Sequence, residues 1–446
     1  MYKEVTMQNP IFNLVKMQKN GIPIGLPSYC TANGIVLEAL LEQAYRFHDS
    51  ILIEATANQV NQYGGYTGMT PADYRDYVYL LADKTGFPKE QILLGGDHLG
   101  PLTWADEPAA SAMEKAEELV RQFVLAGYKK IHLDTSMRLG SDNNNIPLTD
   151  DIIAKRGARL MKVCESAYHE LLKINPDEMH PAYVIGSEVP IPGGSQEKES
   201  SISVTQPEAV AKTISAYKSA FLSEGLQDAF QYIAGIVVQP GVEFGDSDVF
   251  YYNSENALDL ASFIKKYDHI VFEGHSTDYQ TPDSLKSMVQ DGIAILKVGP
   301  ALTFALREGL FALSNMEHYL IPDEVQAHFI QILEDTMLKN SIHWEKHYHG
   351  SAIELAAKRK FSFSDRCRYY FSLPEIINAA EKLFANMEQI DIPLNMLHQF
   401  MPVQYSKVCQ GLLSFTPKAL VKDFVISVAE HYNYATRINY CPPFLL

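Results

Sequence analysis

Cysteine is scarce in this chain of 446 residues, and no CxxC pair occurs. The five cysteines are Cys30, Cys164, Cys367, Cys409 and Cys441. Scattered and odd in number, they indicate neither a disulfide framework nor a thiolate zinc site. Long apolar runs are missing too: no 18-residue stretch occurs, and the opening MYKEVTMQNPIF has no apolar signal core. We therefore expect a cytoplasmic protein in a reducing compartment, with no membrane contact.

Positively charged residues are also fewer than negatively charged ones. Lys and Arg number 37 against 54 Asp and Glu, and the formal net charge is -17. Such a balance keeps a protein soluble and argues against nucleic acid as its partner. A pocket on an acidic protein can still be basic, so an anionic small substrate stays open. No GxGxxG turn follows the first apolar run and no P-loop occurs, which argues against nucleotide-binding folds.

Eight short apolar runs rich in β-branched residues recur over the first 300 residues. They occupy residues 24–30, 51–56, 91–97, 130–134, 182–188, 233–239, 270–275 and 294–299. Near-continuous apolar strands separated by amphipathic helices are typical of a parallel sheet that is covered on its outer face. Eight such units favour a closed (β/α)8 TIM barrel of the α/β class over an open sheet.

The helices between these runs carry ordinary start and stop signals. Thr70 before Pro71 predicts a helix start, and the helical segment 108–126 ends at Gly127. After about residue 318 the alternation stops. Four further helices are predicted at 322–340, 351–358, 374–387 and 417–434. We expect a barrel over residues 1–317 and a helical C-terminal extension over 318–446, packed on the barrel or on a partner subunit.

Two polar insertions follow the fourth and fifth predicted strands. They are residues 138–149 (RLGSDNNNIPLT) and 190–204 (PIPGGSQEKESSISV). Loops at the C-terminal ends of barrel strands lie on the catalytic face. These two segments are therefore either mobile lids or solvated surface insertions.

Polar side chains gather at the C-terminal ends of the predicted strands, which point into the active site of a barrel. They are Ser28, Tyr29, Cys30, Glu54, Thr56, Asn58, Gln59, Asp97, His98, Asp134, Ser136, Ser187, Glu188, Gln239, Glu243, His275, Ser276, Asp278 and Lys297. Burying ionisable groups without partners costs several kcal/mol, so packing does not explain the set. We interpret it as one site. The candidates for substrate binding are Asn58, Gln59, Asp134, Ser276, Asp278 and Lys297.

Within this set, His98, Glu188 and His275 are candidate ligands of one divalent cation. Two imidazoles and a carboxylate suit a catalytic zinc, with manganese or magnesium as alternatives. No local motif links the three, and their shared place at strand ends is the reason for grouping them. Asp97 beside His98 would transfer protons next to the cation, with Glu188 as a second proton-transfer group. The alternative role of Asp97 is to cap the turn GDHLGP.

Other ionisable residues receive weaker interpretations. His132 and Tyr183 fall within strands and are taken as packing or supporting residues. The three histidines of SIHWEKHYHG are interpreted as part of a solvated or interface helix rather than a metal site. In FSFSDRCRYYF, Arg366 and Arg368 suit planar recognition of a phosphate, and a surface salt bridge with Asp365 is the alternative.

Several long motifs resemble one protein family. They are residues 58–78 (NQVNQYGGYTGMTPADYRDYV), 93–104 (LLGGDHLGPLTW), 184–194 (VIGSEVPIPGG), 272–282 (FEGHSTDYQTP), 296–308 (LKVGPALTFALRE) and 392–405 (IPLNMLHQFMPVQY), together with FSFSDRCRYYF. On these residues the chain is similar to the Z-type subunits of tagatose-1,6-bisphosphate aldolase over nearly its whole length.

The resemblance implies a fold like that of catalytic class II aldolases. In those enzymes an Asp-His pair supplies the proton-transfer group and one zinc ligand, and Asp97-His98 matches it. His275 matches a ligand at the end of the seventh strand. The third ligand is a histidine where this chain carries Glu188, which would take its place. The glycine-rich phosphate turn of the aldolases is replaced here by residues 276–278, and Asp278 would repel a phosphate.

Two functions of different class follow from the resemblance. The leading hypothesis is metal-dependent retro-aldol chemistry on a ketohexose phosphate. It would either interconvert fructose 6-phosphate and tagatose 6-phosphate at C4 or act in cleavage of tagatose 1,6-bisphosphate. The alternative is a non-catalytic subunit that stabilises a Y-type aldolase chain. An oligomer is expected in either case. Z-type chains have also been described as tagatose-6-phosphate kinases, for which this sequence offers no kinase signature.

Overall fold

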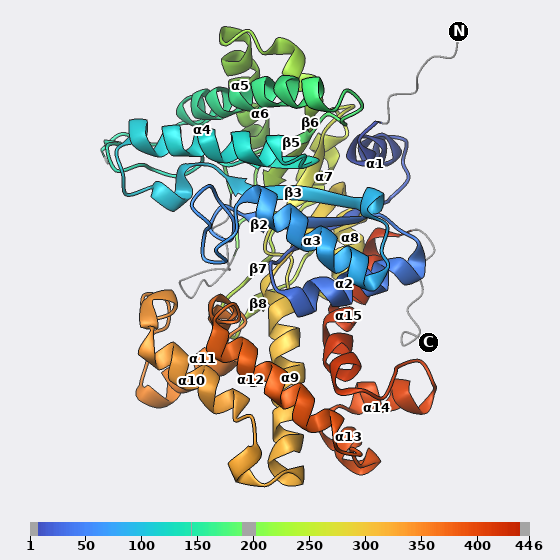
Figure 1. Cartoon of the computed structure of the whole chain (residues 1–446). Coiled ribbons are helices and arrows are strands. Elements are labelled where there is room, and N and C mark those ends of the chain that lie inside the picture. The colour runs from blue at the N-terminus through green and yellow to red at the C-terminus, as the bar shows by residue number, and fades with distance from the viewer. Residues whose placement is uncertain (1–7, 144, 190–201, 438–446) are drawn as a thin grey trace.

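The computed structural model describes residues 8–143, 145–189 and 202–437. Eight parallel strands form a closed barrel in chain order, and β1 pairs with both β2 and β10 (Figure 1). The strands are β1 (Leu26–Cys30), β2 (Ile51–Thr56), β3 (Ile92–Leu99), β4 (Lys130–Leu133), β5 (Ala182–Ile185), β6 (Ile233–Val238), β9 (Val271–Gly274) and β10 (Ile293–Val298). The predicted (β/α)8 barrel is therefore confirmed.

Two strands differ from their predicted bounds in a way that affects the site. β3 runs on to Leu99, so Asp97 and His98 lie inside the strand rather than at and just beyond its end. β5 ends at Ile185, three residues before Glu188. A small antiparallel pair, β7 (Glu243–Phe244) and β8 (Val249–Phe250), follows β6 and was not predicted. Isolated two-residue strands leave no periodic pattern in a sequence, which explains the omission.

A helix before the first strand, α1 (Pro10–Lys19), covers the N-terminal end of the barrel. Its buried residues Ile11, Leu14 and Val15 pack with apolar side chains from inside the barrel, including Leu52 and Leu93. These side chains form a core separate from the main one between the strands and the outer helices. The N-terminal half of the barrel interior is therefore apolar, and the polar side chains are left to the other half.

Outer helices follow the strands as the sequence predicts. They are α2 (Gly34–Phe47), α3 (Pro71–Thr85), α4 (Ala109–Leu125), α5 (Asp150–Ile174), α6 (Pro207–Ser223), α7 (Leu258–Ile264), α8 (Pro282–Gln290) and α9 (Pro300–Leu320). Thr70 and Asp73 form a capping box at the start of α3, and both side chains bond to the backbone there. α4 ends at Leu125, two residues before Gly127, which has a positive φ of 83°.

The C-terminal part is helical, as predicted. Its helices are α10 (Phe329–Lys339), α11 (Ala352–Phe361), α12 (Pro374–Glu388), α13 (Leu394–Phe400), α14 (Pro402–Cys409) and α15 (Pro417–Thr436). The predicted helix over 322–340 is shorter, because α10 begins only after His328, which adopts a left-handed φ of 50°. α9 continues from the barrel into this part, so the proposed boundary at residue 317 falls within a helix (Figure 1).

The last helix returns to the barrel. α15 packs against α9, α8 and α2. Tyr432 in α15 donates a hydrogen bond to the carbonyl oxygen of Thr277 at 2.8 Å, in the loop that follows β9. Gly25, just before β1, donates its N–H to the carbonyl oxygen of Thr436 at 2.9 Å. The extension is thus joined to the two barrel strands that flank β10.

The structure describes nearly all of the first polar insertion, residues 138–149, but little of the second, residues 190–204. In the first, Arg156 pairs with Asp142 at 2.5 Å, and Arg138 donates to the carbonyl oxygens of Asn143 and Ile146. Most of the second, residues 190–201, lies outside the described residues. A role of either segment as a lid stays a prediction.

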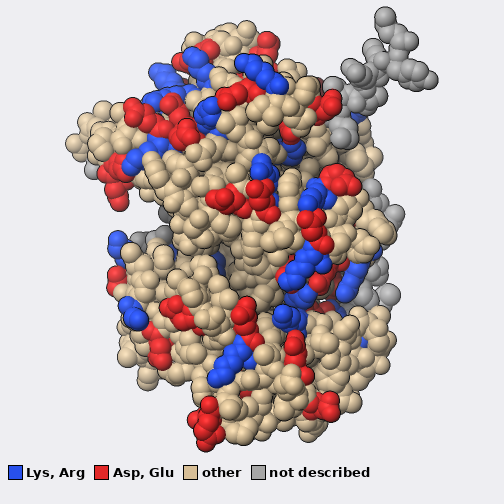
Figure 2. Space-filling view, viewed as in Figure 1, with Lys and Arg blue, Asp and Glu red and all other residues tan. Residues whose placement is uncertain are grey.

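The surface carries both signs of charge. Figure 2 shows Lys and Arg interspersed with Asp and Glu over one face, and a hollow between the barrel and the helical part. A cavity of about 470 Å³ between α2, α3, α9, α12 and α15 corresponds to this hollow. In the part of the chain that the structure describes, no helix is long and apolar enough to cross a lipid bilayer.

Candidate active site and metal centre

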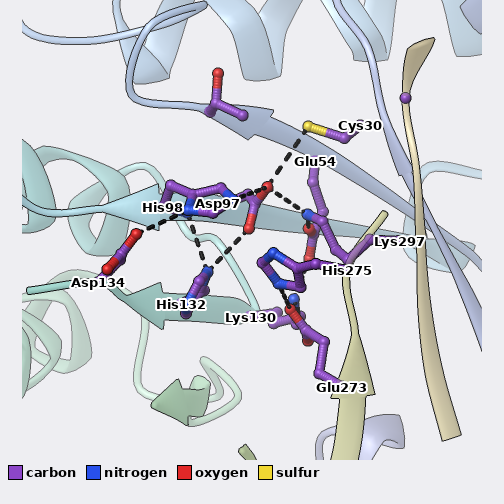
Figure 3. A network of polar contacts seen from close by, with 12 residues as sticks. Cys30, Glu54, Asp97, His98, Lys130, His132, Asp134, Glu273, His275 and Lys297 are labelled. Carbon is purple, nitrogen blue, oxygen red and sulfur yellow. Dashed lines mark hydrogen bonds and ion pairs between the residues drawn. The ribbon is translucent and has the colours of Figure 1, made fainter. Parts of the chain in front are cut away.

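Three barrel strands bring one carboxylate and three imidazoles together. Asp97 and His98 come from β3, His132 comes from β4, and His275 directly follows β9 (Figure 3). One potential ligand atom from each residue lies within 4.8 Å of those of the other three. All four side chains are buried. We call Asp97, His98, His132 and His275 the Asp-His cluster.

The end of β3 is shaped so that two successive side chains reach the barrel interior. Neighbouring side chains normally point to opposite faces of a strand. Here the pairing of β3 with β4 shifts between Gly96 and Leu99, and His98 takes a left-handed φ of 47°. This irregularity turns His98 inward beside Asp97. A Cβ on Gly95 would lie 2.5 Å from Glu54 Oε1, so glycine at this position makes room for a charged side chain inside the barrel.

Carboxylates outside the cluster orient two of its imidazoles. His98 Nδ1 lies 2.8 Å from an oxygen of Asp134, which leaves Nε2 toward the cluster. His275 Nε2 lies 3.0 Å from Glu273 Oε1, which leaves Nδ1. Histidines that ligate a metal commonly donate their other ring N–H to a carboxylate in this way. The two rings are therefore held as a metal site requires.

The third imidazole is in conflict with its surroundings. His132 Nδ1 accepts the backbone N–H of His98 at 3.2 Å and also lies 2.9 Å from Asp97 Oδ1. A nitrogen that accepts the first hydrogen bond presents a lone pair to the carboxylate. His132 Nε2 is buried and has no hydrogen-bond partner among the described residues. Buried polar atoms without partners are costly. A cation that binds both His132 Nδ1 and the Asp97 carboxylate would remove the repulsion between their lone pairs.

A chain of alternating charges lies next to the Asp-His cluster. Lys297 lies 2.7 Å from Asp97 Oδ2 and also pairs with Glu54. Lys130 lies 2.7 Å from both Glu54 and Glu273, and Glu273 contacts His275. All these side chains are buried. We call Glu54, Lys130, Glu273 and Lys297 the charged layer, which links the two sides of the cluster (Figure 3).

The charges in and around the cluster shift one another's pKa values. Burial alone would raise the pKa of Asp97, but His98 and Lys297 beside it hold that pKa well below its usual range. Burial opposes the charge on Lys297 too, yet the carboxylates of Asp97 and Glu54 raise its pKa. Burial lowers the pKa of His275 to about 4. Asp97 is therefore an anion and His275 a neutral imidazole near pH 7.

A cavity opens onto the Asp-His cluster at this end of the barrel. Its lining residues are Cys30, Thr56, Asn58, Gln59, Tyr66, Asp97, His98, Phe244, His275, Ser276, Asp278, Lys297, Val298, Gly299, Pro300, Arg368 and Tyr369. Five of the six predicted substrate-binding residues on strand ends are in this set. The sixth, Asp134, does not line the cavity, but it contacts His98, which does.

Two predicted site residues lie elsewhere. Glu188 is exposed and accepts a hydrogen bond from Thr205 at 2.7 Å, and it belongs to neither the Asp-His cluster nor the cavity lining. Arg366 is buried, and its Nη1 donates to the carbonyl oxygen of His343 at 2.9 Å. Arg368, two residues further on, lines the cavity instead.

The sequence predicts a packing or supporting role for His132, and the structure puts it in the Asp-His cluster. The signal that could have identified it is the alternation in KIHLD. Side chains two apart share a face of a strand, so Lys130, His132 and Asp134 all reach the interior. Contributions of Tyr66, Arg368 and Tyr369 to the cavity come from loops and from the helical part. The sequence marks Arg368 as a candidate for phosphate recognition by its residue type, but no pattern predicts that these three residues meet at the cavity.

The fold and the cluster define a (β/α)8-barrel protein with a buried Asp-His site that can hold a metal. The family model described as D-tagatose-1,6-bisphosphate aldolase subunit GatZ/KbaZ-like matches residues 11–437, and the chain belongs to that family. It is 41% identical to a probable tagatose 6 phosphate kinase from Sinorhizobium meliloti 1021, with a TM-score of 0.84, and the match covers 93% of this chain and 100% of that one.

Two more distant solved structures are also similar to the chain. One is a fructuronate-tagaturonate epimerase from Cohnella laeviribosi, at 11% identity and a TM-score of 0.48, covering 92% of this chain and 82% of that one. The other is a fructose-bisphosphate aldolase from Campylobacter jejuni, at 16% identity and a TM-score of 0.40, covering 86% and 95%.

Proposed function

We propose that this protein is a metal-dependent enzyme that breaks and re-forms the C3–C4 bond of a ketohexose or its phosphate. The observation that carries the proposal is the Asp-His cluster, which joins three imidazoles and an ionised carboxylate at the mouth of the barrel. The family membership supports sugar chemistry of this kind. The products would be the C4 epimer, which links fructose and tagatose 6-phosphates, or two aldol fragments.

The cluster fits a divalent cation on three grounds. Three histidines with an open position are a ligand set that catalytic zinc uses. His98 and His275 are already oriented by carboxylates, and His132 faces Asp97 through Nδ1. We propose that the three imidazoles hold the ion, with zinc favoured over manganese and magnesium because the donors are nitrogen-rich. When bound, the ion supplies positive charge beside the substrate's carbonyl oxygen.

Asp97 is the proposed proton-transfer residue. Its carboxylate would take the proton from the C4 hydroxyl as the C3–C4 bond breaks, and the bond's electron pair would pass into the C2 carbonyl to give an enediolate. C4 leaves as an aldehyde. If the aldehyde turns before C3 attacks it again, the proton returns from Asp97 to the new C4 alkoxide and the epimer forms. Lys297 at 2.7 Å keeps Asp97 ionised for the first step.

The other polar residues of the cavity have proposed binding roles. Asn58, Gln59 and Ser276 present groups that can hydrogen-bond to sugar hydroxyls. Arg368 lines the cavity and lies 4.4 Å from the ring centre of Tyr369, which fixes its guanidinium for an anionic group. The predicted roles of Glu188 as ligand and base, and of Arg366 with phosphate, stay predictions that the geometry of the described residues does not favour.

A second function rests on the family description, which names an aldolase subunit. Such a subunit implies another chain in the complex, and this chain would then stabilise a catalytic Y-type partner. The Asp-His cluster favours the enzyme, because a purely supporting subunit has no need of three convergent imidazoles beside a cavity.

The test uses the purified chain, stripped with a chelator and then loaded with zinc, manganese or magnesium. We expect fructose 6-phosphate or fructose to give the tagatose epimer or triose products, with His98→Ala and chelator each abolishing turnover. In D2O the C4 hydrogen should stay on carbon, because a C–C bond is broken rather than C4–H. No turnover with any metal, together with activation of a co-expressed Y-type aldolase, would overturn the proposal in favour of the second function.

A further inference from the structure

The start of α9 lies at the mouth of the barrel beside the Asp-His cluster. Its first turn follows β10, the eighth strand of the barrel, and the loop after β9, the seventh strand, lies next to it. In many barrels the loops after these two strands and a helix N-terminus form a phosphate site, because free backbone N–H groups and the helix dipole attract an anion. In this chain the same N–H groups already have an acceptor.

That acceptor is the carboxylate of Asp278. Its Oδ1 accepts the N–H of Gly299 at 3.0 Å and the N–H of Ala301 at 2.8 Å. The side chain is 3% exposed and lines the cavity with Ser276 and Lys297. Both hydrogen bonds end on Oδ1, so Oδ2 is the oxygen left to meet a ligand in the cavity.

The carboxylate of Asp278 has little compensating charge. Among the described residues it makes no ion pair with a lysine or arginine, although Arg368 lines the same cavity. Burial raises the pKa of Asp278 to about 6, against the opposing effect of backbone hydrogen bonds, chiefly those from Ala301 and Gly299, and of the charge on Arg368. A group that is costly to keep ionised, and that is aimed into a cavity, is better suited to a ligand hydroxyl than to a second anion.

We propose that Asp278 determines substrate specificity by occupying the phosphate position at the start of α9. The substrate end that lies there carries a hydroxyl, which donates to Asp278 Oδ2. A 1,6-bisphosphate is excluded, because one of its phosphates would compete with the carboxylate for the same two N–H groups and repel it in a buried site. The inference rests on the proposed function and narrows its substrate to ketohexoses that bear at most one phosphate.

The cations of the cavity agree with this assignment. Lys297 is already paired with Asp97 and Glu54, so its charge is compensated within the protein. Arg368 donates to the carbonyl oxygen of Asp365 and the hydroxyl of Tyr369, which are neutral acceptors. A single phosphate at the other end of the sugar would therefore bind toward Arg368.

Binding calorimetry on the zinc-loaded chain tests the assignment without requiring turnover. The ligands are fructose, fructose 6-phosphate, fructose 1,6-bisphosphate and inorganic phosphate. The variants are Asp278→Gly, which empties the position, and Asp278→Asn, which keeps its shape and removes its charge. Asp76→Asn, at an exposed surface pair, is the control. We expect the unchanged chain to bind fructose 6-phosphate at least tenfold more tightly than the bisphosphate.

Both variants should weaken this preference, and the variant that removes the whole side chain should weaken it more than the variant that removes only the charge. Asp278→Gly is expected to abolish the tenfold ratio and to bind inorganic phosphate at least tenfold more tightly than the unchanged chain does. Asp278→Asn should reduce the ratio at least threefold, and it carries the test if the glycine variant does not fold. Bisphosphate binding as tight as that of the monophosphate in the unchanged chain, or an unaltered ratio in both variants, would overturn the inference. Selective binding without turnover would instead count against the proposed reaction alone.

Discussion

The charged layer and the Asp-His cluster are buried side by side in one barrel. They differ in how their polar atoms are paired. In the layer, Lys130 lies between Glu54 and Glu273, and Lys297 lies between Glu54 and Asp97. In the cluster, imidazole nitrogens face one another and a carboxylate, and one nitrogen has no partner in the described chain. Every charge of the layer has an ion-pair partner within the protein, whereas the cluster keeps an imidazole nitrogen without any partner among the described residues.

The charged layer and the residues around it carry an excess of negative charge. The carboxylates of Asp97, Asp134, Glu54 and Glu273 outnumber the two lysine ammonium groups by two when the imidazoles are neutral. A divalent cation in the cluster would balance this surplus. We infer that the layer fixes the shape and the electrostatic potential of the cluster. The surplus negative charge would then be neutralised by a cation bound in the cluster.

The largest effect should come from breaking the layer. Lys130→Met would leave Glu54 and Glu273 as buried carboxylates without their shared cation, and we expect it to cost about 3–5 kcal/mol of unfolding free energy. Urea denaturation of the metal-free chain measures this. The matched control is Lys89→Met, which removes an exposed pair with Asp83 and should cost less than about 1 kcal/mol. Equal midpoints for the two variants would show that the layer does not hold the barrel together.

The next largest effect is the stabilisation by zinc, which depends on the cluster and not on the layer. Zinc at a hundred times its Kd should stabilise the unchanged chain by about 2.7 kcal/mol, by mass action. His132→Asn is expected to lose most of this gain, because the shorter side chain cannot reach the ion. Glu188→Gln should keep it, because Glu188 is exposed and outside the cluster. Thermal melting with and without zinc measures both. The reverse result would restore Glu188 as the third ligand.

A smaller effect is expected from a residue that supports the cluster from outside. Asp134→Asn keeps an acceptor for His98 Nδ1–H but removes the charge that makes the imidazole a better ligand. We expect zinc affinity to fall by about 10-fold to 100-fold. Competition with a chromophoric chelator measures the Kd. Asp142→Asn, in the loop that follows β4, is the control and should leave zinc affinity unchanged.

Much of the fold could be predicted because its signals are local. The eight apolar runs are strands, and Thr70, Pro71 and Gly127 mark helix ends as expected. α1 and the β7–β8 pair escaped prediction, since a single amphipathic helix before the barrel and two-residue strands have no repeat to reveal them. The break before α10 depends on one left-handed residue, His328, whose conformation no composition signal announces.

The site was predictable where strand ends suffice to define it. Asp97, His98 and His275 meet because parallel strands end at one edge of the barrel. His132 was missed because it lies within a strand, although its alternation with Lys130 and Asp134 faces it inward. Glu188 was favoured as the last residue of the predicted strand 182–188, but β5 ends at Ile185 and Glu188 is exposed. Arg368 was a candidate by its residue type alone, because its approach to the cavity from the helical part leaves no local pattern.

The smallest expected effect concerns Asp278, a buried carboxylate outside both groups. Its pKa is about 6 in the folded chain, above its ordinary value of 3.8, because burial disfavours the charged form. The folded state therefore holds the proton more tightly, and this group's contribution to stability falls as pH rises from about 4 to 6. Between pH 5 and pH 7 the loss is about 1 kcal/mol.

Asp278→Asn keeps an oxygen acceptor for the N–H groups of Gly299 and Ala301 and does not titrate. The difference in unfolding free energy between this variant and the unchanged chain should therefore shift in favour of the variant by about 1 kcal/mol from pH 5 to pH 7. Urea denaturation of both metal-free proteins at the two pH values measures it, and effects that do not depend on pH cancel. A difference that stays constant would mean that backbone N–H groups and Arg368 compensate this carboxylate as fully as lysines compensate the charged layer.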